Sequence, residues 1–246
     1  MTLYLADAPA VEYWRRADPS AKTRARAATP FGQDRETPPF SASDLAALEE
    51  AGVGWLSEPI HLLAPDASSR RRCKRTKLHV CSHRLPERSF VKLSRHVMVA
   101  SPELTCLSIA PSTPFPLLVE FLYELCGRYR LPDGRGGDAT ELPPATTVAG
   151  IERFADKARG VRGAADVKRA LRYACDNSLS PMETDIAETM VFDPRMGGFG
   201  LEKPQLNPRF EVTRKNRRAL PQSAYLPDLF WPRANISVEY DSDKHH

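Results

Sequence analysis

Short apolar segments occupy residues 60–100, and longer segments with a helical pattern follow from Ser101. The short runs are separated by Pro or charged residues, as is typical of strands. They are Ile60–Leu63, Leu78–Cys81, Ser89–Leu93 and Val97–Ala100. Helices are predicted over Pro102–Ala110, Leu117–Arg130, Thr147–Ala158 and Val161–Asn177. This order predicts an α+β N-terminal part with a small antiparallel sheet and helices.

The two ends of the chain are expected to differ in organisation. Residues 4–17 suit a short helix, residues 18–42 an irregular arm, and a helix is predicted between Ser43 as N-cap and Gly52 as its end. Another helix is predicted from Ser180 to about Val191, before strands at 209–213, 224–230 and 236–240. We therefore divide the chain into an α+β module at 1–130, a linker with helices at 131–177, and a further domain at 178–246.

Composition limits the class of protein without identifying its function. The 246 residues are 41% hydrophobic, enough for one large or two small cored domains. Five scattered Cys residues do not resemble a disulfide framework, and residues 1–15 lack the pattern of a signal peptide. The longest uncharged stretch, 104–119, is too short and too rich in Pro to span a bilayer. The expected protein is soluble and cytoplasmic.

Two basic clusters are candidate contacts with a nucleic acid. The net charge of +4 is too small to indicate such a partner alone. The first cluster comprises Arg70, Arg71, Arg72, Lys74, Arg75 and Lys77, and the second Arg214, Lys215, Arg217 and Arg218. Such cations would attract a phosphate backbone through counterion release. A solvated loop between strands remains the alternative for the first cluster.

Four residues between 73 and 83 resemble a zinc set only superficially. Cys73, His79, Cys81 and His83 do not have the paired spacing of structural zinc sites, because His79 and Cys81 would share one face of a strand. We favour ordinary half-buried strand residues.

A pair of carboxylates near the C-terminus is the strongest chemical signal. Asp228 and Glu239 flank a predicted hairpin whose tight turn near Arg233 and Ala234 places them opposite each other. Adjacent carboxylates repel unless a cation lies between them, and Mg²⁺ prefers oxygen ligands. Asp241 would share the face of Glu239. The alternative is that both acids meet solvent or Arg233 at a sheet edge.

Glu183 is a third acid with two interpretations. It can join a metal site, but Ser180, Pro181 and Glu183 also have the pattern of a capping box, in which the glutamate reaches back to the Ser180 amide. The residues alone favour the structural role.

Three motifs occur in a characteristic order: Ser180-Pro181-x-Glu183, Asp228-Leu229-x-Trp231-Pro232 and Val238-Glu239-Tyr240-Asp241. Together they resemble the PD-(D/E)xK nuclease superfamily, and more narrowly the endonuclease-like domains grouped with very-short-patch-repair endonucleases. The resemblance covers about residues 178–246. It implies a C-terminal α/β core of the restriction-endonuclease type, in the order helix, strand, strand, strand, with Glu183, Asp228 and Glu239 converging on a divalent metal.

The chain departs from this pattern at two positions and at its end. Asp241 occupies the place of the expected lysine, as in a subgroup with Glu-x-Asp-Gly-x-x-His, although Ser242 replaces the Gly. His245 would then transfer protons. The chain stops at His246, where the family's second helix and fourth strand would begin. We expect an incomplete core, from a truncated reading frame or one completed by another chain, as in a homodimer.

The N-terminal half has a looser resemblance. His61-Leu62-Leu63, residues 99–105 and the following helices are similar to bacterial proteins related to abortive-infection antitoxin regulators. Residues 1–130 would then be a nucleic-acid-binding or regulatory module. The sequence thus predicts an endonuclease-like protein that hydrolyses nucleic acid, DNA in the first instance, with Mg²⁺ or Mn²⁺. The alternative is a non-catalytic DNA-binding regulator of a defence or toxin–antitoxin locus with a degenerate nuclease domain.

Overall fold

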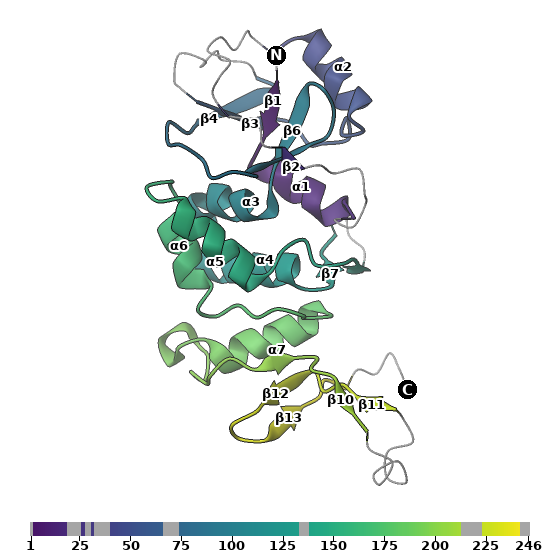
Figure 1. Cartoon of the computed structure of the whole chain (residues 1–246), viewed down its shortest axis with the longest axis vertical. Helices are drawn as coiled ribbons and strands as arrows, with labels where there is room; N and C mark the ends of the chain where they lie inside the picture. The colour runs from purple at the N-terminus through teal and green to yellow at the C-terminus, as the bar shows by residue number, and fades with distance from the viewer. Residues whose placement is uncertain are drawn as a thin grey trace.

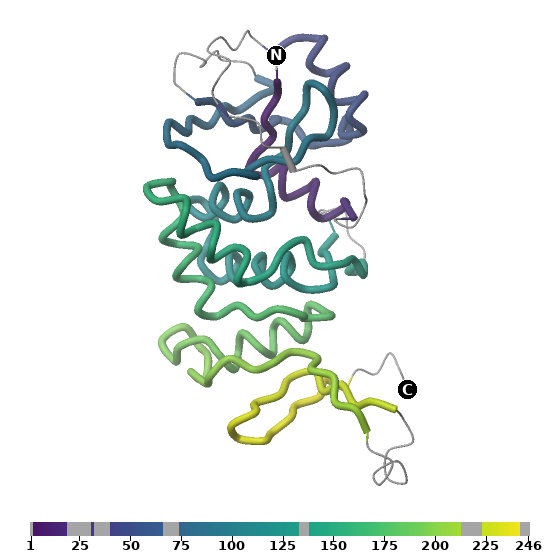
Figure 2. Tube along the Cα trace, viewed as in Figure 1, coloured from purple at the N-terminus to yellow at the C-terminus, as the bar shows by residue number. Residues whose placement is uncertain are grey.

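The computed structural model describes residues 2–18, 26–27, 31, 40–65, 74–132, 138–212 and 223–241. The chain advances from one end of the long axis to the other (Figure 2). A sheet with two helices occupies one end, a group of helices the middle, and one helix with short strands the other end (Figure 1). The fold is α+β, as the sequence predicts.

A mixed sheet forms the N-terminal layer. Among the described residues its order is β2-β5-β6-β1-β3-β4. The strands are β1 Leu3–Leu5, β2 Arg26–Ala27, β3 Ile60–Ala64, β4 Thr76–Val80, β5 Phe90–Lys92 and β6 Val97–Ala100. β1 runs parallel to β6 and β3 runs parallel to β4. The prediction of an antiparallel sheet is therefore wrong: the N-terminal strand inserts between β6 and β3 and runs parallel to β6, and β4 lies parallel to β3.

Two helices accompany this sheet. α1 is Ala8–Arg16 and follows β1, so the helix predicted for residues 4–17 is too long at its N-terminus. The indole N–H of Trp14 donates to the Ala100 carbonyl at 2.9 Å, which fixes α1 against β6. α2 is Ala42–Glu50 with Ser41, not Ser43, as its N-cap. The capping box joins Ser41 to Asp44 and thus starts the helix two residues earlier than predicted.

The middle layer contains α3 Pro102–Ile109, α4 Phe115–Cys126, α5 Val148–Lys157 and α6 Ala164–Ala170. Residues 110–112 form a short 3-10 helix after α3. α6 begins after the predicted Val161 and ends before the predicted Asn177. Its N-cap Gly163 has φ +89°, and a Cβ there would lie 2.1 Å from the Leu107 carbonyl oxygen. This close approach allows α6 to pack beside α3. β7 Tyr129–Arg130 pairs with β8 Thr140–Glu141, and α4 ends before the predicted Arg130.

The C-terminal layer begins with α7 Pro181–Val191, which coincides with the predicted helix. A 3-10 helix at Pro194–Met196 follows. The strands are β9 Gln205–Leu206, β10 Phe210–Glu211, β11 Ala224–Tyr225, β12 Leu229–Trp231 and β13 Ile236–Val238. β13-β12-β9 form one antiparallel sheet and β10-β11 another. These short strands cover the predicted ones only in part.

One hydrophobic core connects the three layers. Buried apolar side chains form a continuous cluster from Leu3 in β1 to Trp231 in β12. The buried hydroxyl of Thr184 in α7 lies 2.9 Å from the Tyr129 hydroxyl, which joins the C-terminal layer to the helices above it. No helix within the described part of the chain is long and apolar enough to cross a membrane.

Candidate active site and metal ligands

The β12–β13 hairpin places Asp228 and Glu239 as the sequence predicts. Leu229 pairs with Val238 and Trp231 with Ile236. Continuing this register by one residue sets Asp228 opposite Glu239, just beyond the last ladder pair. The turn at residues 232–235 includes Asn235 with φ +52°, a conformation that Asn tolerates. The predicted hairpin register is confirmed.

Asp228 and Glu239 each accept a hydrogen bond from their own surroundings. The Oδ2 atom of half-buried Asp228 accepts from the Tyr240 backbone N–H at 2.6 Å. The exposed carboxylate of Glu239 accepts from the Tyr225 hydroxyl. These donors orient both side chains at the same end of the hairpin.

Glu183 is buried at the start of α7 and completes a helix cap. Its backbone N–H donates to the Ser180 hydroxyl oxygen at 3.2 Å, and its Oε1 atom accepts from that hydroxyl at 3.0 Å. Its Oε2 atom accepts from the Leu179 N–H at 2.9 Å and from the Asn207 side-chain amide at 2.7 Å. The carboxylate therefore reaches the Leu179 amide and not, as predicted, that of Ser180.

Burial and neighbouring charges raise the pKa of two of the three acids. Burial raises the pKa of Asp228, and the negative charge of Glu239 adds to this, while the Tyr240 N–H opposes it. Burial also raises the pKa of Glu183 against three hydrogen bonds, and the charge of Asp228 contributes. α7, β12 and the end of β13 thus bring the acids into one neighbourhood. Within the described residues, however, the three acids do not place one oxygen atom each within 4.8 Å of the other two.

The other predicted catalytic residues are less defined. Asp241 is exposed and follows the hairpin. His245 lies outside the described residues.

Only part of the predicted nucleic-acid surface lies within the described residues. Lys74, Arg75 and Lys77 flank or belong to the edge strand β4, and Arg75 is paired with Glu58. The remaining predicted contacts, Arg70, Arg71, Arg72, Arg214, Lys215, Arg217 and Arg218, lie outside the described residues. β4 and β10–β11 occupy opposite ends of the molecule (Figure 1).

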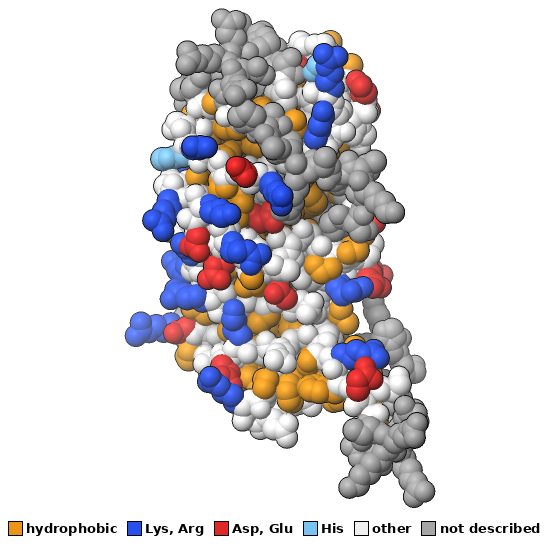
Figure 3. Space-filling model, viewed as in Figure 1, with side chains coloured by type: hydrophobic (Ala, Val, Ile, Leu, Met, Phe, Trp, Pro, Cys, Tyr) orange, Lys and Arg blue, Asp and Glu red, His pale blue; other side chains and the backbone are white. Residues whose placement is uncertain are grey.

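A further basic surface was missed by the sequence reasoning. Exposed cations gather on α5, on α6, in the turn between them and just after α6, and we call this set the α5–α6 basic surface. It comprises Arg153, Lys157, Arg159, Arg162, Lys168, Arg169 and Arg172. Figure 3 shows Lys and Arg side chains gathered along one side of the middle of the molecule. Their spacing on the exposed faces of two predicted helices was the available signal.

The cysteine and histidine residues at 73–83 do not form the zinc set that was considered. Cys73 lies outside the described residues, and the Cys81 thiol points to the His83 carbonyl oxygen at 3.8 Å. His79 instead meets His61 of the neighbouring strand and Asp7, and one ligand atom from each of these three residues lies within 4.8 Å of the others. Asp7, His61 and His79 are therefore a possible metal-binding triad, which sequence spacing alone did not reveal.

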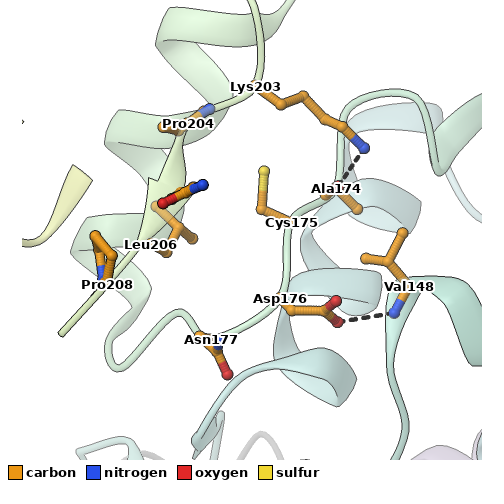
Figure 4. A pocket seen from close by; sticks show the side chains of 10 residues that line it. Val148, Ala174, Cys175, Asp176, Asn177, Lys203, Pro204, Leu206 and Pro208 are labelled. Carbon is orange, nitrogen blue, oxygen red and sulfur yellow. Dashed lines mark hydrogen bonds between the residues drawn. The ribbon is translucent and has the colours of Figure 1, made fainter. Parts of the chain in front are cut away.

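A cavity of about 360 Å³ lies between the start of α5, the segment before α7 and the segment containing β9 (Figure 4). Two charged side chains that line it make hydrogen bonds to the backbone. The Asp176 carboxylate accepts from the Val148 N–H at 2.8 Å, and the Lys203 ammonium donates to the Leu171 and Ala174 carbonyls. None of the three candidate acids lines it, so we assign it no chemistry.

No protein-family model, curated protein or solved structure matches the chain significantly. The functional argument therefore depends on the geometry of the site and on the sequence motifs.

Proposed function

We propose that the chain is a metal-dependent endonuclease that hydrolyses phosphodiester bonds of nucleic acid, with DNA as its substrate. The observation that carries the proposal is the register of the β12–β13 hairpin, which sets Asp228 opposite Glu239. The buried carboxylate of Glu183 on α7 lies in the same electrostatic neighbourhood. The resemblance to the PD-(D/E)xK nucleases implies a metal site at these three acids, and the hairpin register and the position of Glu183 support this proposal.

The donor set suits Mg²⁺ or Mn²⁺. All three groups offer carboxylate oxygens, which these ions prefer. Burial raises the pKa of Asp228 and the charge of Glu239 adds to this, and a bound cation would stabilise the ionised carboxylate. Asp228 and Glu239 would hold the ion, and Glu183 would add a ligand directly or through water. A bound divalent ion polarises the scissile phosphate and lowers the pKa of a water molecule.

The protein's own residues orient this set. The Tyr240 N–H holds the Asp228 carboxylate, the Tyr225 hydroxyl holds Glu239, and Asn207 holds Glu183. His245 is the proposed proton carrier because the pKa of an imidazole suits transfer near neutral pH. The α5–α6 basic surface and the two predicted clusters would bind the phosphate backbone.

Nicking of supercoiled plasmid in MgCl₂ tests this proposal. We expect the parent chain to nick DNA and Asp228→Asn and Glu239→Gln to abolish nicking with an unchanged circular dichroism spectrum. Glu211→Gln removes an exposed acid from the neighbouring strand β10 and is the matched control. Nicking by Asp228→Asn at the parental rate would refute the assignment.

A second candidate function is a non-catalytic DNA-binding regulator. It is favoured by one observation: within the described residues, the oxygens of the three acids do not gather into a set of ligand atoms within 4.8 Å. Plasmid retention in EDTA, measured beside nicking in MgCl₂ or MnCl₂, separates the two functions. Binding without nicking on single-stranded and double-stranded DNA would support the regulator.

A further inference from the structure

Three segments that are distant in the sequence bring Asp7, His61 and His79 together. Asp7 lies between β1 and α1, His61 belongs to β3, and His79 belongs to the parallel neighbour β4. The Nε2 atom of His79 lies 3.1 Å from Nδ1 of His61 and 3.4 Å from Oδ2 of Asp7. Both spacings are close to the distance of about 3.3 Å that separates ligand atoms in a tetrahedral zinc site with bonds of roughly 2.0–2.1 Å.

Asp7 precedes α1, but its side chain does not cap this helix. Asp7 occupies the N-cap position of α1, where aspartate ordinarily accepts a hydrogen bond from the first turn. Here the side chain makes no such bond, and its carboxylate lies against His79 instead. Its backbone has φ +53° and ψ −131°, which is unfavourable for a residue with a Cβ. Strain of this kind at a potential ligand is consistent with a binding site.

We propose that Asp7, His61 and His79 bind one transition-metal ion, with Zn²⁺ as the preferred ion. Two imidazole nitrogens and one carboxylate suit zinc, whereas Mg²⁺ favours oxygen ligands. Three protein ligands leave a fourth position for a water molecule or an anion. The ion joins the β1–α1 junction to β3 and β4, so it fastens the N-terminal strand into the sheet.

The surroundings are compatible with this set of ligands. Burial lowers the pKa of His61 and of His79, which favours neutral imidazoles, and it raises the pKa of Asp7, whose carboxyl must be ionised to bind a metal. The cations Lys77 and Arg162 lie near the triad. Their positive charges repel a metal dication but attract an anion to the fourth position. Lys77→Gln is expected to tighten zinc binding by about two- to fivefold, since it removes one of these charges.

Titration of the EDTA-treated full chain with Zn²⁺ or Co²⁺ tests the proposal. A background variant in which His245 and His246 are replaced by Gln removes the terminal histidine pair as a competing chelator. We expect one ion per chain, with Zn²⁺ raising the melting temperature and a large excess of Mg²⁺ failing to compete. Asp7→Asn, His61→Gln and His79→Gln should each weaken binding by at least about 100-fold.

Two controls separate this site from other ligands. His83→Gln removes an exposed histidine near the same strand and should bind zinc as the parent does. Asp228→Asn should do the same, so the zinc result is independent of the proposed nuclease site. Unchanged zinc binding by all three triad variants would overturn the proposal, as would thiolate-to-cobalt charge-transfer bands in the Co²⁺ complex. Circular dichroism of each metal-free variant distinguishes a lost ligand from a lost fold.

Discussion

The Oδ2 atom of Asp228 accepts a hydrogen bond of 2.6 Å from the backbone N–H of Tyr240, the residue that follows Glu239. This contact continues the hairpin after the β12–β13 ladder has ended, because a side-chain oxygen takes the place of a backbone carbonyl. It holds the two acids at the same end of the hairpin. The metal hypothesis and the purely structural interpretation both depend on this contact, so the useful experiments change charge while preserving shape.

Glu183→Gln separates the role of this residue in the helix cap from its role near a metal. Glutamine can retain the capping-box interactions with Ser180, so we expect little change in stability. A ligand role predicts nicking slower by roughly 10- to 100-fold. Ser180→Ala is the complementary variant, which should lower the free energy of unfolding by about 1 kcal/mol. Urea unfolding and plasmid nicking measure both effects, and parental activity of Glu183→Gln would leave Glu183 as a cap alone.

Glu188 makes stability depend on pH. Burial, assisted by the charges of Glu120 and Asp185, raises its pKa from 4.5 to about 8. The folded chain therefore binds this proton more tightly than the unfolded chain, and stability declines as pH rises from 4.5 through 8. Glu188→Gln should reduce this decline by on the order of 1–3 kcal/mol. Urea unfolding at pH 5 and 8.5 measures it. The exposed Glu152→Gln is the control, and an equal effect there would contradict the prediction.

Arg130 is buried at the junction of the sheet and the helices, with 1% of its surface exposed. Its guanidinium donates to the backbone carbonyls of Trp14, Glu124, Tyr129 and Pro143. The bond to Glu124 provides a partner for a carbonyl in the last turn of α4. Arg130→Met would leave these carbonyls without a partner, and we expect it to lower the free energy of unfolding by roughly 3–5 kcal/mol.

The neighbouring Arg128 provides the matched control for that experiment. Its side chain is half-exposed, and its guanidinium forms a long ion pair of 3.8 Å with the Glu141 carboxylate. Arg128→Met should therefore change the free energy of unfolding by less than about 1 kcal/mol. Chemical denaturation of both variants checks the difference. Similar losses in the two variants would mean that the buried carbonyl contacts are unimportant.

Local signals in the sequence predicted the elements that begin with their own caps or turns. α7 begins after Ser180 and the hairpin register follows from its short turn, because residues close in the chain determine both. The insertion of β1 between β6 and β3 was missed, since a strand of three residues has no distinctive pattern and its partners are distant.

Separation along the chain also explains which residues of the candidate sites were predicted from the sequence. Asp228 and Glu239 are joined by one hairpin and could be paired from the sequence. Asp7, His61 and His79 meet only because three strands assemble in a particular order. A sequence gives no register for such pairings before the topology is known. His79 was interpreted as an ordinary half-buried strand residue, and its contacts with Asp7 and His61 were not predicted.

The α5–α6 basic surface should contribute to DNA binding if the chain acts on nucleic acid. We expect Arg153→Gln with Lys157→Gln to weaken binding and to reduce the slope of log K against log salt by about 0.9 for each cation that contacts a phosphate. Lys92→Gln with Arg95→Gln removes the same charge from the exposed end of β5 and the turn that follows it, and is the control. Fluorescence anisotropy over a salt series distinguishes them. Equal slopes for the two double variants would show that only net charge matters, because a localised contact must depend on which cations are removed.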